Sequence, residues 1–510
     1  MEQESKNKKY RLSAAVWVAI LTGLFSQILS YAFNYNYAYR DSIYRLEAAR
    51  RFFDALEPGI ISQIGTVWLP VPNLLLMPFA CVDYLWETGL AASIVNLPAF
   101  IAAAVFIFLS LKKITGSPVA TWFGFVVFIF NYNILYYQTT AMTEQLYITF
   151  LTGAFYFLLL WSGTNKNSHL ILASFFMMLG TGTRYDAWPV LLASAVIVFI
   201  IGIPRKKHFS SALIFSSLPV LLIVWWFVHN WYYYGDVLEF SRGKFSTLHQ
   251  LKYYEDAGRL LTKNDFLLSA KVYACSVLLY SGNFCVVLSV IGLVFYALKN
   301  KFDLESFVPY LLWVALPTTL ILLYKGQLII EHPLSVPEGY FNSRYGLYLF
   351  PAVAVFAGYS VLLLEKFKAK KVLLYLLWTG FLIQQVVFLY NFPYSIPSLA
   401  EAKYSYSKPS EDLSAFLKEN YKGGRILYDN LIFALDPRTK INLKDRVTFH
   451  THDLGEKAMN NPSQFVEWVI IYTDAPNDKI YDAVKNNDDF KINFEKKFSE
   501  MGVEVYRKKN

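Results

Sequence analysis

Charged side chains that could carry chemistry stand at the ends of long apolar runs in this chain. Asp41 lies in the stretch 37–59, which holds eight charged residues directly after the first apolar run. Glu144 opens a later run, and Arg184 and Asp186 stand together in "GTGTRYDAW". A further loop supplies more ionisable groups: Lys325, Glu331, His332, Glu338 and Arg344. Carboxylates can act as general bases and guanidinium groups grip phosphate, so these residues are candidates for acid–base and anion-binding chemistry.

The elements that must position these groups are predicted to be membrane-spanning helices. The 510 residues are 55% hydrophobic and only 17% charged, whereas soluble domains carry about 25% charged residues. About eleven apolar runs are long enough to cross a bilayer. They lie near 13–33, 89–111, 119–136, 145–162, 169–183, 187–203, 211–231, 270–298, 306–324, 345–364 and 372–391. The stretch 70–86 is shorter and broken by proline, so we expect it to be re-entrant or interfacial.

The first run has a basic flank but no small-residue cleavage site after it, so we expect a retained helix and not a removed signal peptide. Short basic tracts with almost no acid, such as 111–113 and 204–208, are typical of cytoplasmic loops. The N-terminus is therefore predicted to be cytoplasmic. The candidate residues then all fall on the outer side, and with an odd number of spans the residues after about 395 also lie outside. The net charge of +9 follows from these tracts and does not indicate nucleic-acid binding.

Residues 396–510 differ in composition and predict a small extracytoplasmic α/β domain after a membrane domain of residues 1–395. A helix-like stretch is followed by three β-rich runs, "GGRILYD", "FVEWVIIYT" and "GVEVYRKK". The motif "HTHD" at 450–453 lacks the further ligands of a metal site and is interpreted as a polar loop. The three cysteines show no metal-site spacing.

The stretch after the first span has a helical apolar pattern. One stripe, with spacings of three and four, is formed by Ile43, Leu46, Ala49, Phe53 and Leu56. This predicts an amphipathic helix lying along the membrane. Asp41 stands just before the stripe, where it could simply cap the helix. A structural and a chemical role for Asp41 are both open on this pattern alone.

Several short motifs follow one another in a fixed order on the predicted outer side. They comprise Asp41, Pro58–Gly59, Gly65, Trp68, Pro70, Met142, Glu144, Thr183–Trp188 and Arg344–Pro351. This order resembles the GT-C superfamily of polytopic membrane glycosyltransferases. The nearest resemblance is to the bacterial and archaeal relatives of the protein O-mannosyltransferases and the aminoarabinose lipid A transferases. It covers most of residues 13–395, and a trailing outer α/β domain is also common in such relatives.

The resemblance implies an inverting transfer of a sugar from a polyprenyl-phosphate donor to a lipid, glycan or protein acceptor. It implies that the first-loop acid, Asp41, takes the proton of the acceptor hydroxyl. Fixed cations should face the leaving phosphate, with Arg344 first and Lys325, His332 and Arg184 next. Glu144 could orient the acceptor, bind a metal or pair with an arginine. Arg184 and Asp186 could equally form a structural salt bridge.

No cofactor is expected, because Asp41 has no acidic neighbour and stands as Arg-Asp-Ser. Some family members carry two adjacent acids or a D-x-D element tied to a divalent metal. Asp41 with Glu144 could still make a weak Mg or Mn site.

Two other classes of protein remain as alternatives. A transporter or flippase of lipid-linked glycans would tend to show internal repeats and charges at mid-membrane, whereas here the charges stand at the outer ends. A non-catalytic glycan-assembly subunit on the same scaffold would be favoured by loss of the first-loop acid, but Asp41 is present.

Overall fold

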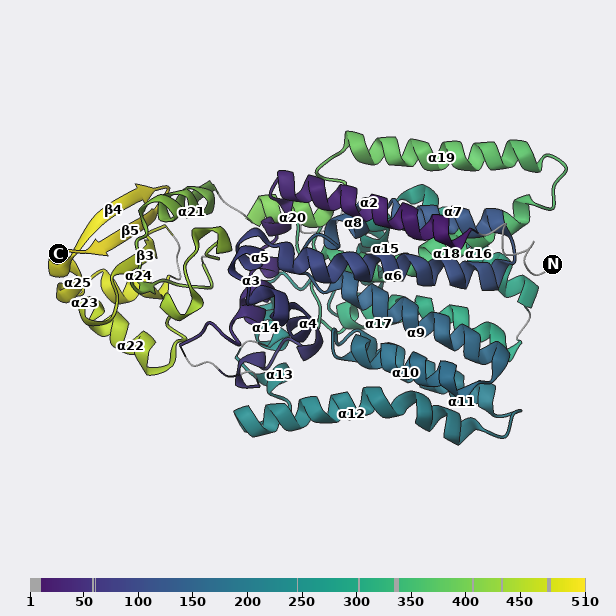
Figure 1. Ribbon diagram of the computed structural model, residues 1–510, viewed down its shortest axis with the longest axis horizontal. Helices are drawn as coiled ribbons and strands as arrows, with labels where there is room; N and C mark the ends of the chain where they lie inside the picture. The colour runs from purple at the N-terminus through teal and green to yellow at the C-terminus, as the bar shows by residue number, and fades with distance from the viewer. Residues whose placement is uncertain are drawn as a thin grey trace. The chain divides into compact units, whose positions relative to one another are not determined.

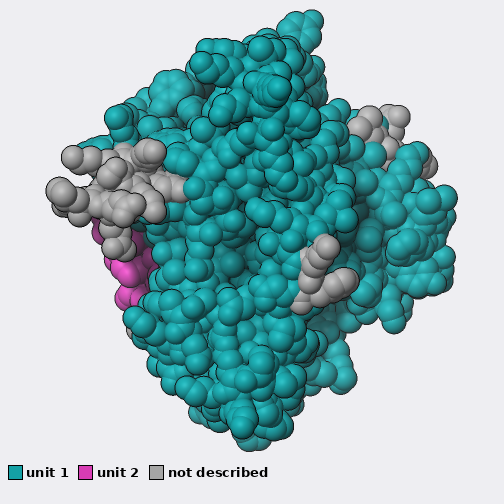
Figure 2. Space-filling view, turned by 90° about the vertical axis from the view of Figure 1, so that its right-hand side faces the viewer, with its two compact units in different colours: residues 1–35, 65–72, 93–401 teal, residues 36–64, 73–92, 402–510 magenta. Residues whose placement is uncertain are grey.

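The computed structural model describes residues 11–56, 59, 61–244, 246–300, 303–333, 339–405, 408–432, 434–474 and 478–509. Pro58 and Glu338, two of the residues singled out in the sequence, lie outside these ranges. The chain forms two compact units. Unit 1 comprises residues 1–35, 65–72 and 93–401, and unit 2 comprises residues 36–64, 73–92 and 402–510. Figure 2 colours the units separately.

Unit 1 is built from helices, many of which run side by side (Figure 1). The helices long and apolar enough to cross a membrane within the described residues are α2 (Leu12–Ala32), α6 (Leu90–Thr115), α9 (Glu144–Thr164), α12 (His208–Tyr234), α16 (Asn283–Asn300), η4 with α18 (Ser343–Leu364) and α19 (Lys370–Tyr390). A bent pair at 45° can form an eighth span: η3 (Leu304–Trp313) and α17 (Ala315–Tyr324). Shorter apolar helices are α4 (Pro70–Ala80), α7 (Pro118–Ile129), α11 (Ala187–Gly202) and α15 (Phe266–Ser281). The remaining helices that concern the site are α8 (Tyr132–Tyr137), α10 (Asn167–Thr181), α13 (Glu239–Arg242), α14 (Thr247–Asp256) and α20 (Pro397–Ser405).

The apolar run 270–298 was predicted as one span, and this is wrong. The structure has two helices there, α15 and α16, which meet at Gly282. Gly282 is the C-cap of α15 and has φ 79° and ψ 141°, a backbone conformation that favours glycine. An uninterrupted helix of that length would also exceed the usual span of about 20 residues. Hydrophobicity alone could not show this break, because both helices are apolar.

Helix α18 is the most buried of the long spans, with 89% of its apolar window inside the protein. It packs against α16 and α7. A Cβ on Gly292 of α16 would lie 1.9 Å from the Phe356 carbonyl oxygen, and one on Gly124 of α7 would lie 2.7 Å from the Ala354 carbonyl oxygen. In lipid, small residues allow helices to pack at this close range. The segment that precedes α18 is therefore held by a rigid central helix.

Unit 2 contains a five-stranded sheet in the order β2-β1-β3-β5-β4. The strands are β1 (Ile426–Leu427), β2 (Arg446–Val447), β3 (Trp468–Tyr472), β4 (Phe494–Glu500) and β5 (Val503–Lys508). Strands β2, β1 and β3 are parallel, whereas β5 is antiparallel to both β3 and β4. The helices that follow the first span and those of the C-terminal segment are α3 (Arg40–Arg50), α5 (Asp83–Thr88), α21 (Lys408–Asn420), α22 (His452–Asn460), α23 (Pro462–Phe465), α24 (Lys479–Val484) and α25 (Asp488–Asn493).

Both faces of this sheet are covered, as the side-chain alternation of β3 shows. Trp468 and Ile470 belong to a core that includes Leu413 and Leu417 of α21. Val469 and Ile471 belong to a second core that includes residues of α22, α24 and α25. Successive residues of a strand point to opposite faces. The three β-rich runs predicted from the sequence correspond to β1, β3 and β5 in this three-layer unit.

Candidate active site

Glu144 is the first residue of α9 and its side chain is fully buried. Its Oε1 lies 3.2 Å from Arg184 Nη1 and 3.3 Å from Arg344 Nε. The Tyr348 hydroxyl donates to the same oxygen at 3.3 Å. Three segments far apart in the sequence therefore meet at one carboxylate in unit 1. We call this set, together with Asp186, the Glu144 cluster.

Arg184 is held in the loop between α10 and α11 by its own neighbours. Its Nε donates to Asp186 Oδ2 at 2.9 Å, and its Nη1 also donates to Thr143 Oγ1 at 3.1 Å. The guanidinium carbon lies 4.7 Å from the centre of the Tyr348 ring, which adds a cation–π contact. The arginine thus bridges two carboxylates and an aromatic ring.

The aromatic residues of the "TRYDAW" motif anchor this loop. The Tyr185 ring stacks on Phe240 of α13 at 5.2 Å between centroids. The Trp226 Nε1 of α12 donates to the Tyr185 hydroxyl at 3.2 Å, and the Trp188 Nε1 donates to the Thr181 carbonyl at 3.1 Å. These contacts fix the backbone on both sides of Arg184, which orients its guanidinium.

Arg344 comes from η4 (Ser343–Leu349), directly before the buried helix α18. The preceding residue, Ser343, is fully buried, and its hydroxyl lies 3.3 Å from the Tyr280 hydroxyl of α15. The Tyr280 hydroxyl in turn lies 2.7 Å from the Ser398 hydroxyl. This chain of hydroxyl groups ties η4 to α15 and α20, so Arg344 is placed by a packed segment and not by a free loop.

The Glu144 cluster holds two carboxylates and two guanidinium groups, so its formal charges cancel. The side chains of Arg184 and Arg344 are 12% and 13% exposed, whereas Glu144 is 0% exposed. Glu144 Oε2 is buried and has no hydrogen-bond partner among the described residues. A buried carboxylate that orients two partly exposed arginines suits the binding of an oxyanion, because guanidinium groups grip phosphate through paired hydrogen bonds.

The donor set of this cluster does not fit a divalent metal. Glu144 already shares one oxygen with two guanidinium groups, and a metal cation there would face both positive charges at close range. Across the described parts of the chain, no group of three or more His, Cys, Asp and Glu side chains could hold a metal ion.

The contacts that define the Glu144 cluster do not include Lys325 or His332. Lys325 is exposed at the C-terminal cap of α17. His332 is buried, and its Nε2 lies 3.1 Å from the Val272 carbonyl oxygen of α15. Burial lowers the pKa of His332 below its ordinary value of 6.5, although this hydrogen bond opposes the shift. The neutral imidazole is therefore favoured at pH 7, which weakens its candidacy as a cation.

Asp41 lies in unit 2, in the first turn of α3. The N-cap interpretation is wrong: the N-cap residue is Tyr39, whose side chain makes no capping hydrogen bond. The helix is also shorter than the apolar stripe predicted. It ends at Arg50, and Phe53 lies beyond it with 53% of its surface exposed. Asp41 itself is partly exposed, as a residue that meets a substrate must be.

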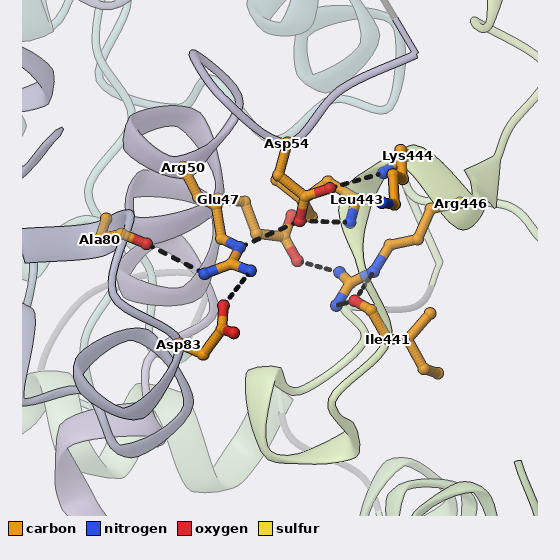
Figure 3. A network of polar contacts seen from close by, with 9 residues as sticks. All are labelled: Glu47, Arg50, Asp54, Ala80, Asp83, Ile441, Leu443, Lys444 and Arg446. Carbon is orange, nitrogen blue, oxygen red and sulfur yellow. Dashed lines mark hydrogen bonds and ion pairs between the residues drawn. The ribbon is translucent and has the colours of Figure 1, made fainter. Parts of the chain in front are cut away.

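Three other charged residues of the stretch 37–59 bind the C-terminal segment of unit 2: Arg40, Glu47 and Asp54, of which Figure 3 shows the last two. Glu47 pairs with Arg446, the first residue of β2, and both side chains are buried. Arg50 pairs with Asp54 at 3.0 Å and with Asp83 at 2.5 Å. Asp54 also accepts hydrogen bonds from the backbone amides of Leu443 and Lys444 at 3.0 and 3.2 Å. Two further side chains of α3 bind carbonyl groups of this segment: Arg40 to Ile432 and Tyr44 to Asn430.

This network gives a structural role to four of the charges that follow the first span, Arg40, Glu47, Arg50 and Asp54, and sequence reasoning missed it. Arg446 donates to the Ile441 and Leu435 carbonyls as well as to Glu47, so each of its three guanidinium nitrogens donates a hydrogen bond. Another missed partner is Arg259, which binds Glu331 in unit 1 through contacts of 2.6 to 3.1 Å. No local pattern marks Arg259 or Arg446, because each meets its partner only in the folded chain.

We predict that Glu47→Gln will destabilise unit 2 by about 3–5 kcal/mol, because Arg446 would remain buried without its carboxylate partner. Hydrogen exchange of the peptide 426–447, in protein reconstituted in nanodiscs, reports this opening. Asp83→Asn is the matched control, since Asp83 also pairs with an arginine but is 73% exposed. Asp83→Asn should lower the free energy of unfolding of unit 2 by no more than about 1 kcal/mol. Equal exchange in the two variants would contradict the prediction.

No protein-family model and no curated protein sequence matches this chain. Several solved structures, in contrast, are similar to this chain. An oligosaccharyltransferase of Archaeoglobus fulgidus, in complex with Zn and sulfate, superposes with TM-score 0.55 at 10% identity, over 97% of this chain and 73% of that one. Another structure of the Archaeoglobus fulgidus oligosaccharyltransferase AglB, with an inhibitory peptide and a dolichol-phosphate, gives 0.50 at 11% identity, over 99% and 75%. ArnT of Cupriavidus metallidurans bound to undecaprenyl phosphate gives 0.51 at 9% identity, over 95% and 97%.

These likenesses extend over nearly the whole chain and over nearly all of ArnT. They agree with the many apolar helices long enough to cross a membrane and with the small C-terminal sheet. The chain is thus a polytopic membrane protein with the fold of the GT-C glycosyltransferases.

Proposed function

We propose that this protein is an inverting glycosyltransferase that moves a sugar from a polyprenyl-phosphate donor to a lipid, glycan or protein acceptor at the outer face of the membrane. The observation that carries the proposal is the Glu144 cluster, in which one buried carboxylate holds two arginines at the ends of helices of a GT-C fold. An anionic lipid-linked donor needs such oriented cations where it leaves the bilayer.

The reaction assigns a distinct task to each kind of residue. Asp41 takes the proton from the acceptor hydroxyl as that oxygen attacks the anomeric carbon. The new bond forms on the face opposite the leaving group, so the anomeric configuration inverts. The bond between the anomeric carbon and the phosphate oxygen breaks, and both its electrons go to the phosphate. Arg344, with Arg184 beside it, stabilises the growing negative charge.

The solved neighbours support a polyprenyl-phosphate donor. ArnT was solved bound to undecaprenyl phosphate, and AglB was solved with a dolichol-phosphate and an inhibitory peptide. In this chain, the phosphate of such a donor would be held by the guanidinium groups of Arg344 and Arg184. Asp186 and Glu144 would keep both groups in place, while Lys325 and His332 stay secondary candidates for contact with the donor.

The proposal is tested by offering the purified protein, in liposomes, a panel of labelled polyprenyl-phosphate sugars alongside nucleotide sugars. We expect one lipid-linked sugar to be cleaved or transferred and the nucleotide sugars to remain intact. The movement of labelled lipid-linked glycan across the bilayer is measured in the same vesicles. Movement without cleavage across the panel would instead support a flippase.

We predict that transfer will be unchanged in EDTA, because a metal ion at Glu144 would face the positive charges of Arg184 and Arg344 at close range. The measurement compares initial rates before and after chelation and then after Mg or Mn is added back. A rate that falls with EDTA and recovers with either metal would show that a divalent cation takes part.

A further inference from the structure

Unit 2 contains a polar cavity of about 630 Å³ that the proposed transfer reaction does not use. Its sixteen lining residues come from the segment 47–63 and from the C-terminal segment 428–465. Tyr428 and Asn430 follow β1, and Thr448 and His450 follow β2. These strands are parallel, and the carboxyl ends of parallel strands are where open α/β sheets bind ligands.

Two cations of the lining form no short contact with a carboxylate, although Arg51 interacts electrostatically with Glu47. The side chains of Arg51 and Lys457 are exposed and make no hydrogen bond or ion pair with the described residues. Arg446 and Glu47 also line the cavity but neutralise one another. Asp453 is the one other carboxylate among the described residues of the lining. The described lining holds three cations (Arg51, Arg446 and Lys457) and two carboxylates (Glu47 and Asp453), so it keeps one net positive charge, which an anionic group would satisfy.

The rest of the lining suits the hydroxyl groups and apolar faces of a sugar. Asn430 Oδ1 is buried and has no hydrogen-bond partner among the described residues. Buried polar atoms of this kind are rare in folded proteins and call for a partner. The Thr448 hydroxyl lies beside these groups, and the rings of Tyr428 and Phe465 supply apolar surface. An inorganic ion would leave Asn430 and both rings without a contact.

We propose that this cavity binds an acidic saccharide, whose carboxylate or phosphate group is held by Arg51 and Lys457 and whose hydroxyl groups meet Asn430 and Thr448. The volume falls within the range of about 300–1,000 Å³ typical of small-molecule sites. Binding of this saccharide in the cavity does not depend on the proposed sugar transfer.

The test is calorimetric titration of the full-length protein in nanodiscs, without any sugar donor. The probes are trigalacturonic acid, the neutral trisaccharide maltotriose and inorganic phosphate. We expect trigalacturonic acid to bind, and to bind at least about tenfold more tightly than either other probe. Arg51→Gln and Lys457→Gln should each weaken its binding by about tenfold or more, since hydrogen bonds to charged groups contribute at least that much.

Arg425→Gln and Lys491→Gln are matched controls, because both side chains are exposed cations of unit 2 outside the cavity lining. They should leave the dissociation constant unchanged. Maltotriose binding as tightly as the acidic probe would overturn the charge assignment. Phosphate binding as tightly would reduce the cavity to an adventitious anion site, and undetectable binding of trigalacturonic acid would overturn the proposal.

Discussion

Replacing Asp41 with asparagine should lower the rate of sugar transfer by about 10²–10⁴-fold, the usual contribution of a general base. Asparagine has nearly the same shape but cannot take the acceptor proton. Asp41 lies in the first turn of α3 and is partly exposed, so its loss should cost the helix only about 0.3–1 kcal/mol. The measurement is the initial rate of transfer from the active lipid-linked sugar in liposomes.

The control for this change is Asp83→Asn, which removes an exposed carboxylate from the same unit. Its transfer rate should equal that of the unaltered protein. A lower rate in Asp41→Asn with unchanged hydrogen exchange across α3 would separate chemistry from folding. Transfer at the normal rate in Asp41→Asn would place the base elsewhere.

Replacing Arg344 with glutamine should reduce transfer by about 10²–10³-fold, the size expected when a donor to a developing oxyanion is lost. The effect should fall mainly on kcat, because the charge on the phosphate grows in the transition state. Arg344→Lys should recover only part of the rate, since lysine keeps the charge but cannot form the paired hydrogen bonds of guanidinium.

Arg259→Gln is the matched control for Arg344→Gln. Arg259 also pairs with a buried glutamate in unit 1, Glu331, which does not belong to the Glu144 cluster. It should leave the transfer rate nearly unchanged. Equal losses in the two variants would show that Arg344 serves the fold of unit 1 and not the leaving phosphate.

The Glu144 cluster could be predicted in part from the sequence. Glu144, Arg184 and Arg344 each stand at the end of an apolar run, and the topology places such ends at the same side of a helical bundle. The sequence does not show which of these helix ends contact one another in the folded chain. Lys325 follows the same rule, yet it is exposed at the cap of α17, because the helical register, and not the order of spans, decides where each side chain points.

The charged stretch 37–59 shows what local patterns cannot reveal. Its helix and its position after the first span were predictable, but the partner of Glu47 lies 399 residues away in β2. That strand has only two residues, so no alternation marks it in the sequence. The number of charges in this stretch suggested a catalytic role, whereas three of them, Arg40, Glu47 and Asp54, bind the C-terminal segment of unit 2.

The most direct test of the account is a mass-spectrometric assay of liposomes that hold the purified protein, a polyprenyl-phosphate sugar and a candidate acceptor. We predict that free polyprenyl phosphate and glycosylated acceptor will appear together in equal amounts, and that both will be lost in Asp41→Asn. Cleavage of a nucleotide sugar instead, or product formed equally by the Asp41→Asn variant, would contradict it.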